Sequence, residues 1–368
     1  MGSQQTKVIT TGEERQDFMK NVLNDLKALE MMLENGMIET GVKRIGAEQE
    51  LNLVGHNFRP AMVGMDIFEK LNADFLTLEY AKFNLEINSD PIDFSNDCLV
   101  KLKNELRKKL KIVDRAAIGF DATVALAGIL PTIRKDDVTP DALTPVPRFK
   151  ALFDVVQKAR GRNYEFHIEG VDQLITRDNP VAFGGCMTSF QIHLQTEPYD
   201  IVDLYNWSQA ISGPLLACAV NSPIFLGKRL WRETRIALFQ QTSDTRKPYQ
   251  NFIEEDARVS FGNQWVEKSI LEVFQDDVAK YRAYLSTDVD EDSVAMVEEG
   301  LVPKLKALTF HNGTVYKWNR PCYGVIDGKP HLRIENRIFP AGPTLEDEIA
   351  NTALWLGVMN ALPQEYRS

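Results

Sequence analysis

The sequence predicts an α+β fold, in which strands and helices are mixed without the regular alternation of a doubly wound sheet. Two observations support this class. Several short segments alternate strictly between polar and apolar residues, as half-buried antiparallel strands do. Long amphipathic helical patterns, the clearest at 11–36 and 97–118, lie between these segments but do not follow each strand in turn.

The composition is that of a globular protein, and it excludes several function classes. The chain has 368 residues, 44% of them hydrophobic, and a formal net charge of -10. Such an acidic chain is a poor partner for nucleic acid, because contact with the phosphate backbone needs a basic surface. A small anionic substrate needs only a local group of arginines and stays open. No apolar run approaches the about 18 residues of a membrane span, so we expect no membrane contact.

The cysteines indicate the compartment. Cys98, Cys186, Cys218 and Cys322 are widely spaced and form no C-x-x-C pair. This spacing argues against a zinc site or a disulfide framework. We therefore expect reduced thiols in a cytoplasmic protein.

The first element is an amphipathic helix at 11–36. Thr11 and Glu14 stand at the spacing of a capping box, in which each side chain satisfies a backbone N–H at the helix start. No later segment has the composition of a linker. We therefore divide the chain into an N-terminal tail and helix at 1–42 and one domain at 43–368.

Three further helices are expected, and the last begins with a second capping box formed by Thr344 and Asp347. Two connecting segments, one rich in Pro and Thr and one acidic, are expected to form an ordered loop and an exposed surface. The helices are predicted at 97–118, at 200–219 and from Pro343 onward, and the two connecting segments at 126–150 and 286–300.

Strands are predicted wherever polar and apolar residues alternate. Side chains on a strand point to opposite faces with a period of two, so the polar residues of each segment share one face. Here these faces hold carboxylates, amides, His and Arg, which bind hard cations and phosphates, although any one segment could be an ordinary solvated strand. The predicted strands are 43–54, 80–88, 189–196, 313–320 and 331–339. The polar sets are Glu48, Glu50 and Asn52; Lys82, Asn84, Glu86 and Asn88; Ser189, Gln191, His193 and Gln195; and His331, Arg333, Glu335 and Arg337.

The acidic residues of these faces suggest a metal site. Glu48 and Glu50 stand two apart on one strand, so their side chains are about 6–7 Å apart and repel each other unless a cation lies between them. Carboxylate oxygens suit Mg²⁺. If the strands are neighbours, Glu86, His193 and Glu335 converge on the same cations.

Arginines after residue 226 are candidates for phosphate binding. Arg235 and Arg246 could each bind a phosphate oxygen pair, since the guanidinium fork matches phosphate and keeps its charge. Equally, they could pair on the surface with Glu233 and Asp244. Arg320 is a candidate for binding a substrate carboxylate. The chain has no G-x-x-x-x-G-K-[ST] sequence, no G-x-G-x-x-G after a strand and no G-x-S-x-G, so we expect neither a P-loop, a Rossmann fold nor a serine hydrolase.

Together these motifs resemble the glutamate–cysteine ligase and carboxylate–amine ligase family. Each motif is weak by itself, but five of them in order, from about residue 44 to 360, are fairly specific. They are Gly46-Ala47-Glu48-Gln49-Glu50, Leu85-Glu86-Ile87-Asn88-Ser89-Asp90-Pro91, Ser189-Phe190-Gln191-Ile192-His193, Ala219-Val220-Asn221-Ser222-Pro223 with Arg235 and Arg246, and Arg333-Ile334-Glu335-Asn336-Arg337.

The resemblance implies a glutamine-synthetase-like catalytic fold, with a curved antiparallel sheet forming a funnel. It implies an ATP- and Mg²⁺-dependent (or Mn²⁺-dependent) ligase that joins a carboxylate, by family default the γ-carboxylate of glutamate, to an amine through an acyl phosphate. The implied partners are ATP and amino acids, and a homo-oligomer is compatible with this. The implied metal ligands are Glu48, Glu50, Glu86, His193 and Glu335; Arg235, Arg246 and Arg337 would act on phosphates; Lys82, Asn84, Gln191 and Arg333 would contact the nucleotide; and Arg320 and Asn88 would bind substrate.

Two departures leave the substrate open. Gly128-Ile129-Leu130-Pro131 lacks the histidine of a G-T-H-P segment, and the third strand reads Gln191-Ile192-His193 rather than His-x-His. Cysteine is therefore only one candidate for the acceptor amine. A phosphotransferase of the guanidino-kinase kind and a non-catalytic nucleotide-binding regulator remain as alternatives. For an active ligase, we expect Glu48→Gln or Glu335→Gln to abolish turnover without loss of stability.

Overall fold

The computed structural model describes residues 6–160, 165–177, 180–244, 246 and 256–367. Its centre is an antiparallel sheet with the strand order β15-β16-β9-β2-β4-β3, in which β5 and β6 also pair with β2. The sheet is curled like half a barrel. Its strands are β2 (Arg44–Gly55), β3 (Leu76–Leu78), β4 (Asn84–Asn88), β5 (Ile92–Asp93), β6 (Ala122–Ala125), β9 (Phe190–Thr196), β15 (Asn319–Ile326) and β16 (Lys329–Asn336).

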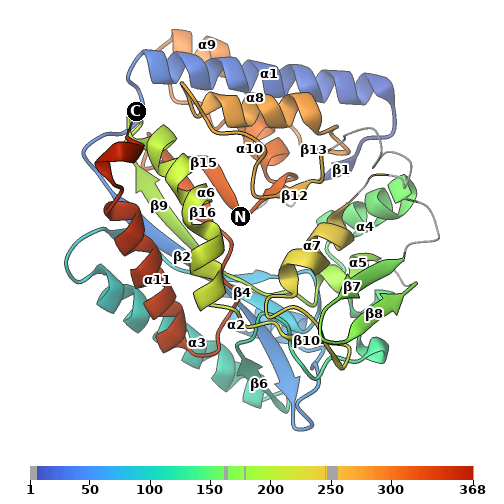
Figure 1. Cartoon of the computed structure of the whole chain (residues 1–368). Coiled ribbons are helices and arrows are strands. Elements are labelled where there is room, and N and C mark those ends of the chain that lie inside the picture. The colour runs from blue at the N-terminus through green and yellow to red at the C-terminus, as the bar shows by residue number, and fades with distance from the viewer. Residues whose placement is uncertain (1–5, 161–164, 178–179, 245, 247–255, 368) are drawn as a thin grey trace.

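One face of this sheet is apolar and covered by helices. Leu51, Leu85, Ile192 and Ile334 are fully buried there in the main core. The covering helices are α3 (Cys98–Ile118), α6 (Ile201–Cys218) and α11 (Leu345–Asn360), which lie together on one side of the sheet (Figure 1). The predicted helices at 97–118, at 200–219 and after Pro343 are confirmed, including the Thr344 cap that accepts from the Asp347 amide.

A second group of helices lies across the top of the molecule in Figure 1. It contains α1 (Gly12–Glu34), α8 (Leu271–Lys280), α9 (Ser293–Glu298) and α10 (Lys306–Asn312). The capping box of α1 is present as predicted, with Thr11 and Glu14 bonded reciprocally. Phe18, Val22 and Leu29 of α1 are buried in the same core as the sheet, because α1 packs on α8, α9 and α10.

The opposite, polar face of the sheet lies toward smaller elements on the right of Figure 1. These are α4 (Pro147–Arg160), α5 (Pro180–Gly184), α7 (Arg235–Ser243) and the hairpin of β7 (Phe166–Glu169) with β8 (Gln173–Thr176). Short paired strands complete the described chain: β1 (Lys7–Val8) with β13 (Leu285–Ser286), β10 (Ile224–Phe225) with β11 (Lys228–Arg229), and β12 (Val259–Ser260) parallel to β14 (Tyr316–Lys317). The remaining helix is α2 (Gly64–Leu71), and short 3-10 turns lie at Lys135–Asp137, Pro140–Ala142 and Gln364–Tyr366.

Four predicted elements differ from their observed counterparts. The strand expected at 80–88 begins only at Asn84, because Ala81 bridges to Leu143 and the chain turns there. The strand expected at 313–320 is divided between β14 and β15. The end of the loop expected at 126–150 is helical from Pro147 onward, and the acidic surface segment contains α9, whose Ser293 and Val297 are buried.

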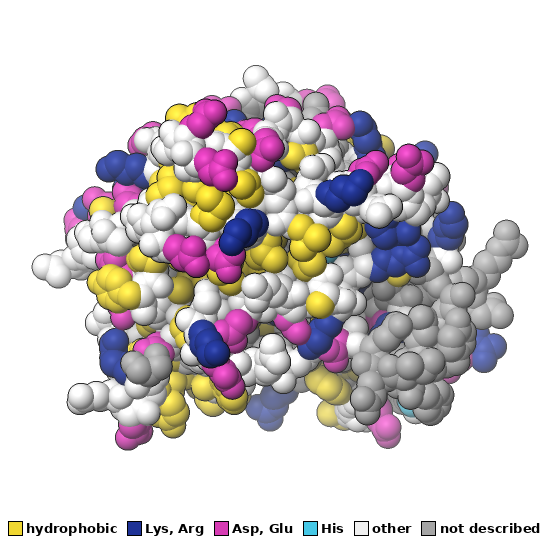
Figure 2. Space-filling model, turned by 90° about the horizontal axis from the view of Figure 1, so that it is seen from above, with side chains coloured by type: hydrophobic (Ala, Val, Ile, Leu, Met, Phe, Trp, Pro, Cys, Tyr) yellow, Lys and Arg dark blue, Asp and Glu magenta, His cyan; other side chains and the backbone are white. Residues whose placement is uncertain are grey.

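The face of the molecule that Figure 2 shows agrees with the acidic composition of the chain. The face seen in Figure 2, over α1, α8 and α9, carries acidic and basic side chains interspersed with apolar ones and shows no basic field. Within the described ranges, no helix is long and apolar enough to cross a membrane. The four cysteines are unpaired, and only Cys218 is exposed.

Candidate active site

The four polar segments are neighbours in the sheet, as the metal hypothesis required. Glu335 of β16 stands opposite His193 of β9. His193 stands opposite Gly46, and two residues along β2, Glu48 pairs with Gln191. Glu50 pairs with Glu86 of β4. One sheet face therefore collects acidic residues that are far apart in the sequence.

On this face, Glu48, His193 and Glu335 form a first cluster, which we call the paired cluster. Their ligand atoms lie within 4.8 Å of one another. Arg320 donates two hydrogen bonds to Glu335, of 2.7 and 3.0 Å. Burial opposes the charge of Glu335, but the charges of Arg320 and Arg337 outweigh it and hold the pKa of this carboxyl well below its usual range. Cations of the chain therefore already balance this cluster.

The contacts of its two ring nitrogens limit the ability of His193 to bind a cation. Arg333 Nε donates to its Nδ1 at 3.1 Å, so the neutral ring carries its proton on Nε2. Nε2 lies 3.2 Å from Glu48 Oε1, but it forms no aligned hydrogen bond there. Burial opposes the charge of Glu48, and contact with His193 more than offsets it, so the pKa of Glu48 is lowered. To bind a cation through either ring nitrogen, neutral His193 would have to give up its contact with Arg333, because the cation must either take Nδ1 or displace the proton from Nε2 to Nδ1.

Glu50, Glu79 and Glu86 form a second cluster, the unpaired cluster, again with ligand atoms within 4.8 Å. Burial, reinforced by the charge of Glu50, raises the pKa of Glu79 to about 8. Burial and the neighbouring charges of Glu48 and Glu79 raise the pKa of Glu86 well above its usual value. The pKa of Glu50 is also raised by burial, although its carboxylate accepts hydrogen bonds from Ser189 and Gln191. Three carboxylates in this state need a proton or a cation.

Glu79 was not among the site residues predicted from the sequence. It lies in the turn between β3 and β4, outside the alternating pattern, and its position beside Glu50 depends on the pairing of β3 with β4. The only local signal is an acidic residue directly before a strand that carries Glu86. That signal is too common to use alone.

The other predicted site residues divide into those at the clusters and those away from them. Gln191 bridges the clusters, because it donates to Glu50 at 2.8 Å and accepts from Arg337 at 2.5 Å. Asn88 donates to Glu86 at 3.0 Å. Asn84 is buried and donates instead to Asn52 Oδ1 at 3.0 Å. Lys82 lies in the turn before β4 and does not share the alternation of that strand.

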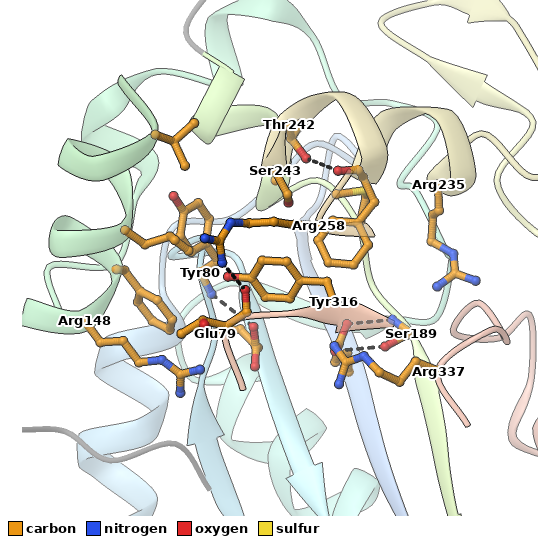
Figure 3. A pocket seen from close by; sticks show the side chains of 18 of the residues that line it. Glu79, Tyr80, Arg148, Ser189, Arg235, Thr242, Ser243, Arg258, Tyr316 and Arg337 are labelled. Atoms are coloured by element: carbon orange, nitrogen blue, oxygen red, sulfur yellow. Dashed lines mark hydrogen bonds between the residues drawn. The ribbon is translucent and has the colours of Figure 1, made fainter. Parts of the chain in front are cut away.

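A cavity of about 220 Å³ opens over the unpaired cluster (Figure 3). Glu50, Ser189 and the turn residue Glu79 line its base, and α4 and α7 form part of its walls. Arginines line it from several elements: Arg148, Arg235, Arg258 and Arg337. Of these, Arg148 and Arg258 were not singled out from the sequence, because neither belongs to an alternating strand or to the Arg-rich segment.

The predicted phosphate arginines occupy different places. Arg337 and Arg235 both line the cavity. Arg235 is buried, bonds to Glu233 at 2.6 Å and to the carbonyl of Ile338, and lies over the ring of Trp318. Arg246 donates to Asp244 at 2.9 and 3.0 Å and is not among the described residues that line the cavity.

Comparison with known proteins now identifies the family. The model of the glutamate–cysteine ligase family 2 matches residues 44–368. This chain belongs to that family. The match confirms the resemblance of the five ordered motifs to the glutamate–cysteine ligase and carboxylate–amine ligase family, and it covers all five.

Solved structures relate this member of glutamate–cysteine ligase family 2 to larger proteins. A glutamate–cysteine ligase from Francisella tularensis, solved with AMP, is 12% identical with a TM-score of 0.50, over 88% of this chain and 67% of that one. A bifunctional glutathione synthetase from Pasteurella multocida is 11% identical with a TM-score of 0.49, over 93% of this chain and only 40% of that one. The first likeness supports a common fold. No curated protein matches the sequence.

Proposed function

We propose that this protein is an ATP- and Mg²⁺-dependent ligase that joins a carboxylate, with glutamate as the expected donor, to an amine. The observation that carries the proposal is the unpaired cluster at the base of a cavity lined by Arg235 and Arg337. Unbalanced carboxylates suit a divalent cation, and arginines suit phosphate. A nucleoside triphosphate with its metal needs both. Cysteine is one candidate acceptor.

The residues of the unpaired cluster fit Mg²⁺ or Mn²⁺. Glu50, Glu79 and Glu86 offer only oxygen donors, and burial beside like charges disfavours all three in their ionised form unless a cation is added. Glu48 and Glu335 provide a second set, with His193 beside them. When bound, the metal would neutralise phosphate charge and help to orient the triphosphate.

The proposed reaction has two transfers. An oxygen of the γ-carboxylate of glutamate attacks the γ-phosphorus of ATP, the bond from that phosphorus to the β–γ bridging oxygen breaks, and ADP leaves. The nitrogen of the amine then attacks the acyl carbon, the carbon–oxygen bond to the phosphoryl group breaks, and inorganic phosphate leaves. The amine proton passes to solvent. Arg235 and Arg337 would stabilise the charge on the transferring phosphoryl group.

Other polar residues would act through these groups. We assign Arg320 to holding Glu335, because both of its hydrogen bonds to that carboxylate would be lost if it bound substrate. Arg333 would hold His193, and Asn88 would orient Glu86. Direct nucleotide contacts by Lys82, Asn84 and Arg246 have less support, because none of them is among the described residues that line the cavity.

The proposal extends to the architecture. We take the curled antiparallel sheet as a glutamine-synthetase-like catalytic fold, with 43–368 as one catalytic domain after the tail and helix at 1–42. The start of the family match at residue 44 supports this division. Unpaired cysteines support a cytoplasmic location.

The deciding experiment incubates the protein with ATP, Mg²⁺, glutamate and pooled amines, and measures ADP, phosphate and new amides. We expect glutamate-dependent phosphate release that rises with an added amine. Glu79→Gln should remove it, and the exposed Glu298→Gln should not. A phosphorylated guanidino product would favour the phosphotransferase, although none of the four cysteines lines the cavity. Binding of ATP without turnover in any mixture would favour a regulator.

A further inference from the structure

Away from the carboxylates, the cavity continues into a space with apolar and aromatic walls, which we call the aromatic chamber. Phe149, Leu152 and Val155 of α4 line it, together with Tyr284 and Leu285. Val155 and Leu285 are buried in one small apolar cluster, against which Leu152 and Tyr284 pack. The chamber is therefore a continuous apolar surface, with the charged sheet face at one end.

One buried cation, Arg258, projects into this chamber. Its side chain is 7% exposed, and its guanidinium lies over the rings of Tyr284 at 4.9 Å and Tyr281 at 5.6 Å. In Figure 3 Arg258 lies in the upper part of the cavity, above Ser189 and Arg337. Its Nη1 donates to the carbonyl of Thr314 at 3.2 Å, and its Nη2 donates to the carbonyl of Arg282.

No carboxylate balances the charge of Arg258 within the described part of the chain. No described acidic residue forms an ion pair with it. The acidic residue that acts on it electrostatically, Asp277, is already paired with Lys317. Burial lowers the pKa of Arg258, as expected for a cation removed from water. A buried charge without a counter-ion is costly, so a ligand anion would stabilise it.

We propose that Arg258 binds the carboxylate of the amine substrate and that the aromatic chamber holds its side chain, so that the acceptor is an amino acid with an aliphatic or aromatic side chain. This inference rests on the proposed function, since it names the acceptor of that ligation. Three parts of such a substrate match three parts of the cavity. Its amine lies toward Glu79 and Arg337, where the acyl group would form; its carboxylate meets Arg258; and its side chain meets Leu152 and Val155.

Arg148 is a weaker candidate for the same role. Its charge acts on Glu79 and opposes the rise in the pKa of that carboxyl, so the unpaired cluster already balances part of the charge of Arg148. Arg235 and Arg337 are likewise engaged, by Glu233 and by Gln191 and Glu335. Among the described residues, the hydrogen bonds of Arg258 go to neutral carbonyls alone.

The test measures binding by calorimetry, using L-phenylalanine, L-phenylalaninamide and glycine as probes of the full-length protein. Phenylalanine should bind roughly tenfold or more tightly than its amide, because a charge-assisted contact contributes about 1.5–3 kcal/mol. Arg258→Gln should remove this preference, because it should weaken the binding of phenylalanine and leave the binding of the amide unchanged. Arg282→Gln, an exposed neighbour, should leave it unchanged.

Two further variants keep the test decisive if Arg258→Gln does not fold. Arg258→Lys keeps the charge and should retain part of the preference. Leu152→Gln leaves Arg258 intact. It should weaken the binding of phenylalanine and leave the binding of glycine unchanged. Equal binding of phenylalanine and its amide by the wild type, or displacement of phenylalanine by ATP alone, would overturn the inference. Because binding needs no turnover, a preference without ligation would refute only the proposed function, and ligation of cysteine or small amines alone would refute only this inference.

Discussion

Glu86 and Glu335 lie on the same sheet face, yet their charges are balanced in opposite ways. Glu335 is held by Arg320 and Arg337. Glu86 is surrounded by Glu48, Glu50 and Glu79, and within the described part of the chain it accepts a hydrogen bond only from the neutral amide of Asn88. The same substitution should therefore have opposite effects on stability at the two positions.

Glu86→Gln is expected to stabilise the metal-free protein by roughly 1 kcal/mol, because it removes a buried carboxyl that must either stay charged among like charges or take up a proton on folding. Glu335→Gln is expected to destabilise it by about 3 kcal/mol, because it leaves Arg320 buried without its partner. This revises the expectation from sequence alone that Glu335→Gln would be tolerated. Urea denaturation in EDTA measures both. A similar loss in both variants would mean that the carboxylates of the unpaired cluster are structural.

At the scale of elements, the contact between α11 and the sheet contains a buried acid. Glu348 Oε1 accepts from the Gly342 amide at 2.6 Å, whereas Glu348 Oε2 and Gln49 Oε1 accept no hydrogen bond from the described residues. A proton on Glu348 Oε2 would let that oxygen donate a hydrogen bond to Gln49 Oε1 and so give both atoms a partner. Burial, the largest cause, raises the pKa of Glu348 to about 8.

The protonated form of Glu348 therefore favours the fold, and its contribution is complete below the ordinary pKa of glutamate, near 4.5. This contribution should be lost as the pH rises from there to about 8. Glu348→Gln should remove this pH dependence and stabilise the protein at pH 8 relative to wild type, by on the order of 1–4 kcal/mol. Denaturation curves of both proteins from pH 5 to pH 9 measure it. Parallel curves would show that Glu348 does not titrate in this range.

Helix α1 provides a second prediction at this scale, because its packing unites the N-terminal segment with the rest of the core. Leu29→Ala should cost about 2–5 kcal/mol, since Leu29 is fully buried in the main core. Leu23→Ala on the same helix should cost little, since Leu23 is 53% exposed. Thermal unfolding compares the two. Equal, small effects would mean that α1 is not part of the cooperative unit.

At the scale of the whole molecule, the acidic sheet face should couple cation binding to global stability. A cation that binds only the folded chain stabilises it by about 2.7 kcal/mol at about 100 times its Kd. Mg²⁺ or Mn²⁺ should therefore raise the melting temperature, and Glu79→Gln should reduce the rise. The control is the melting temperature in a buffer that contains no divalent cation and has the same ionic strength. An equal rise in wild type and variant would indicate general screening rather than a site.

Much of this molecule follows from local patterns. The helices at 11–36 and 97–118 were predictable from their apolar spacing and the Thr11 cap, which act within a few residues. The strand faces that carry Glu48, Glu86 and His193 were predictable because strand periodicity is local. The family also followed from the order of these motifs, and the match over 44–368 confirms it. The roles of the individual site residues remain predictions.

The sequence by itself determined which side chains share a strand face, because alternation depends only on neighbouring residues. Only the tertiary structure decided which faces meet and how their charges are balanced. It divided one expected metal set into a paired and an unpaired cluster, added Glu79 from a turn, and used Arg320 to hold Glu335. The physical reason is that pKa values and ion pairs depend on burial and on distances between strands, and the pairing of distant segments sets both.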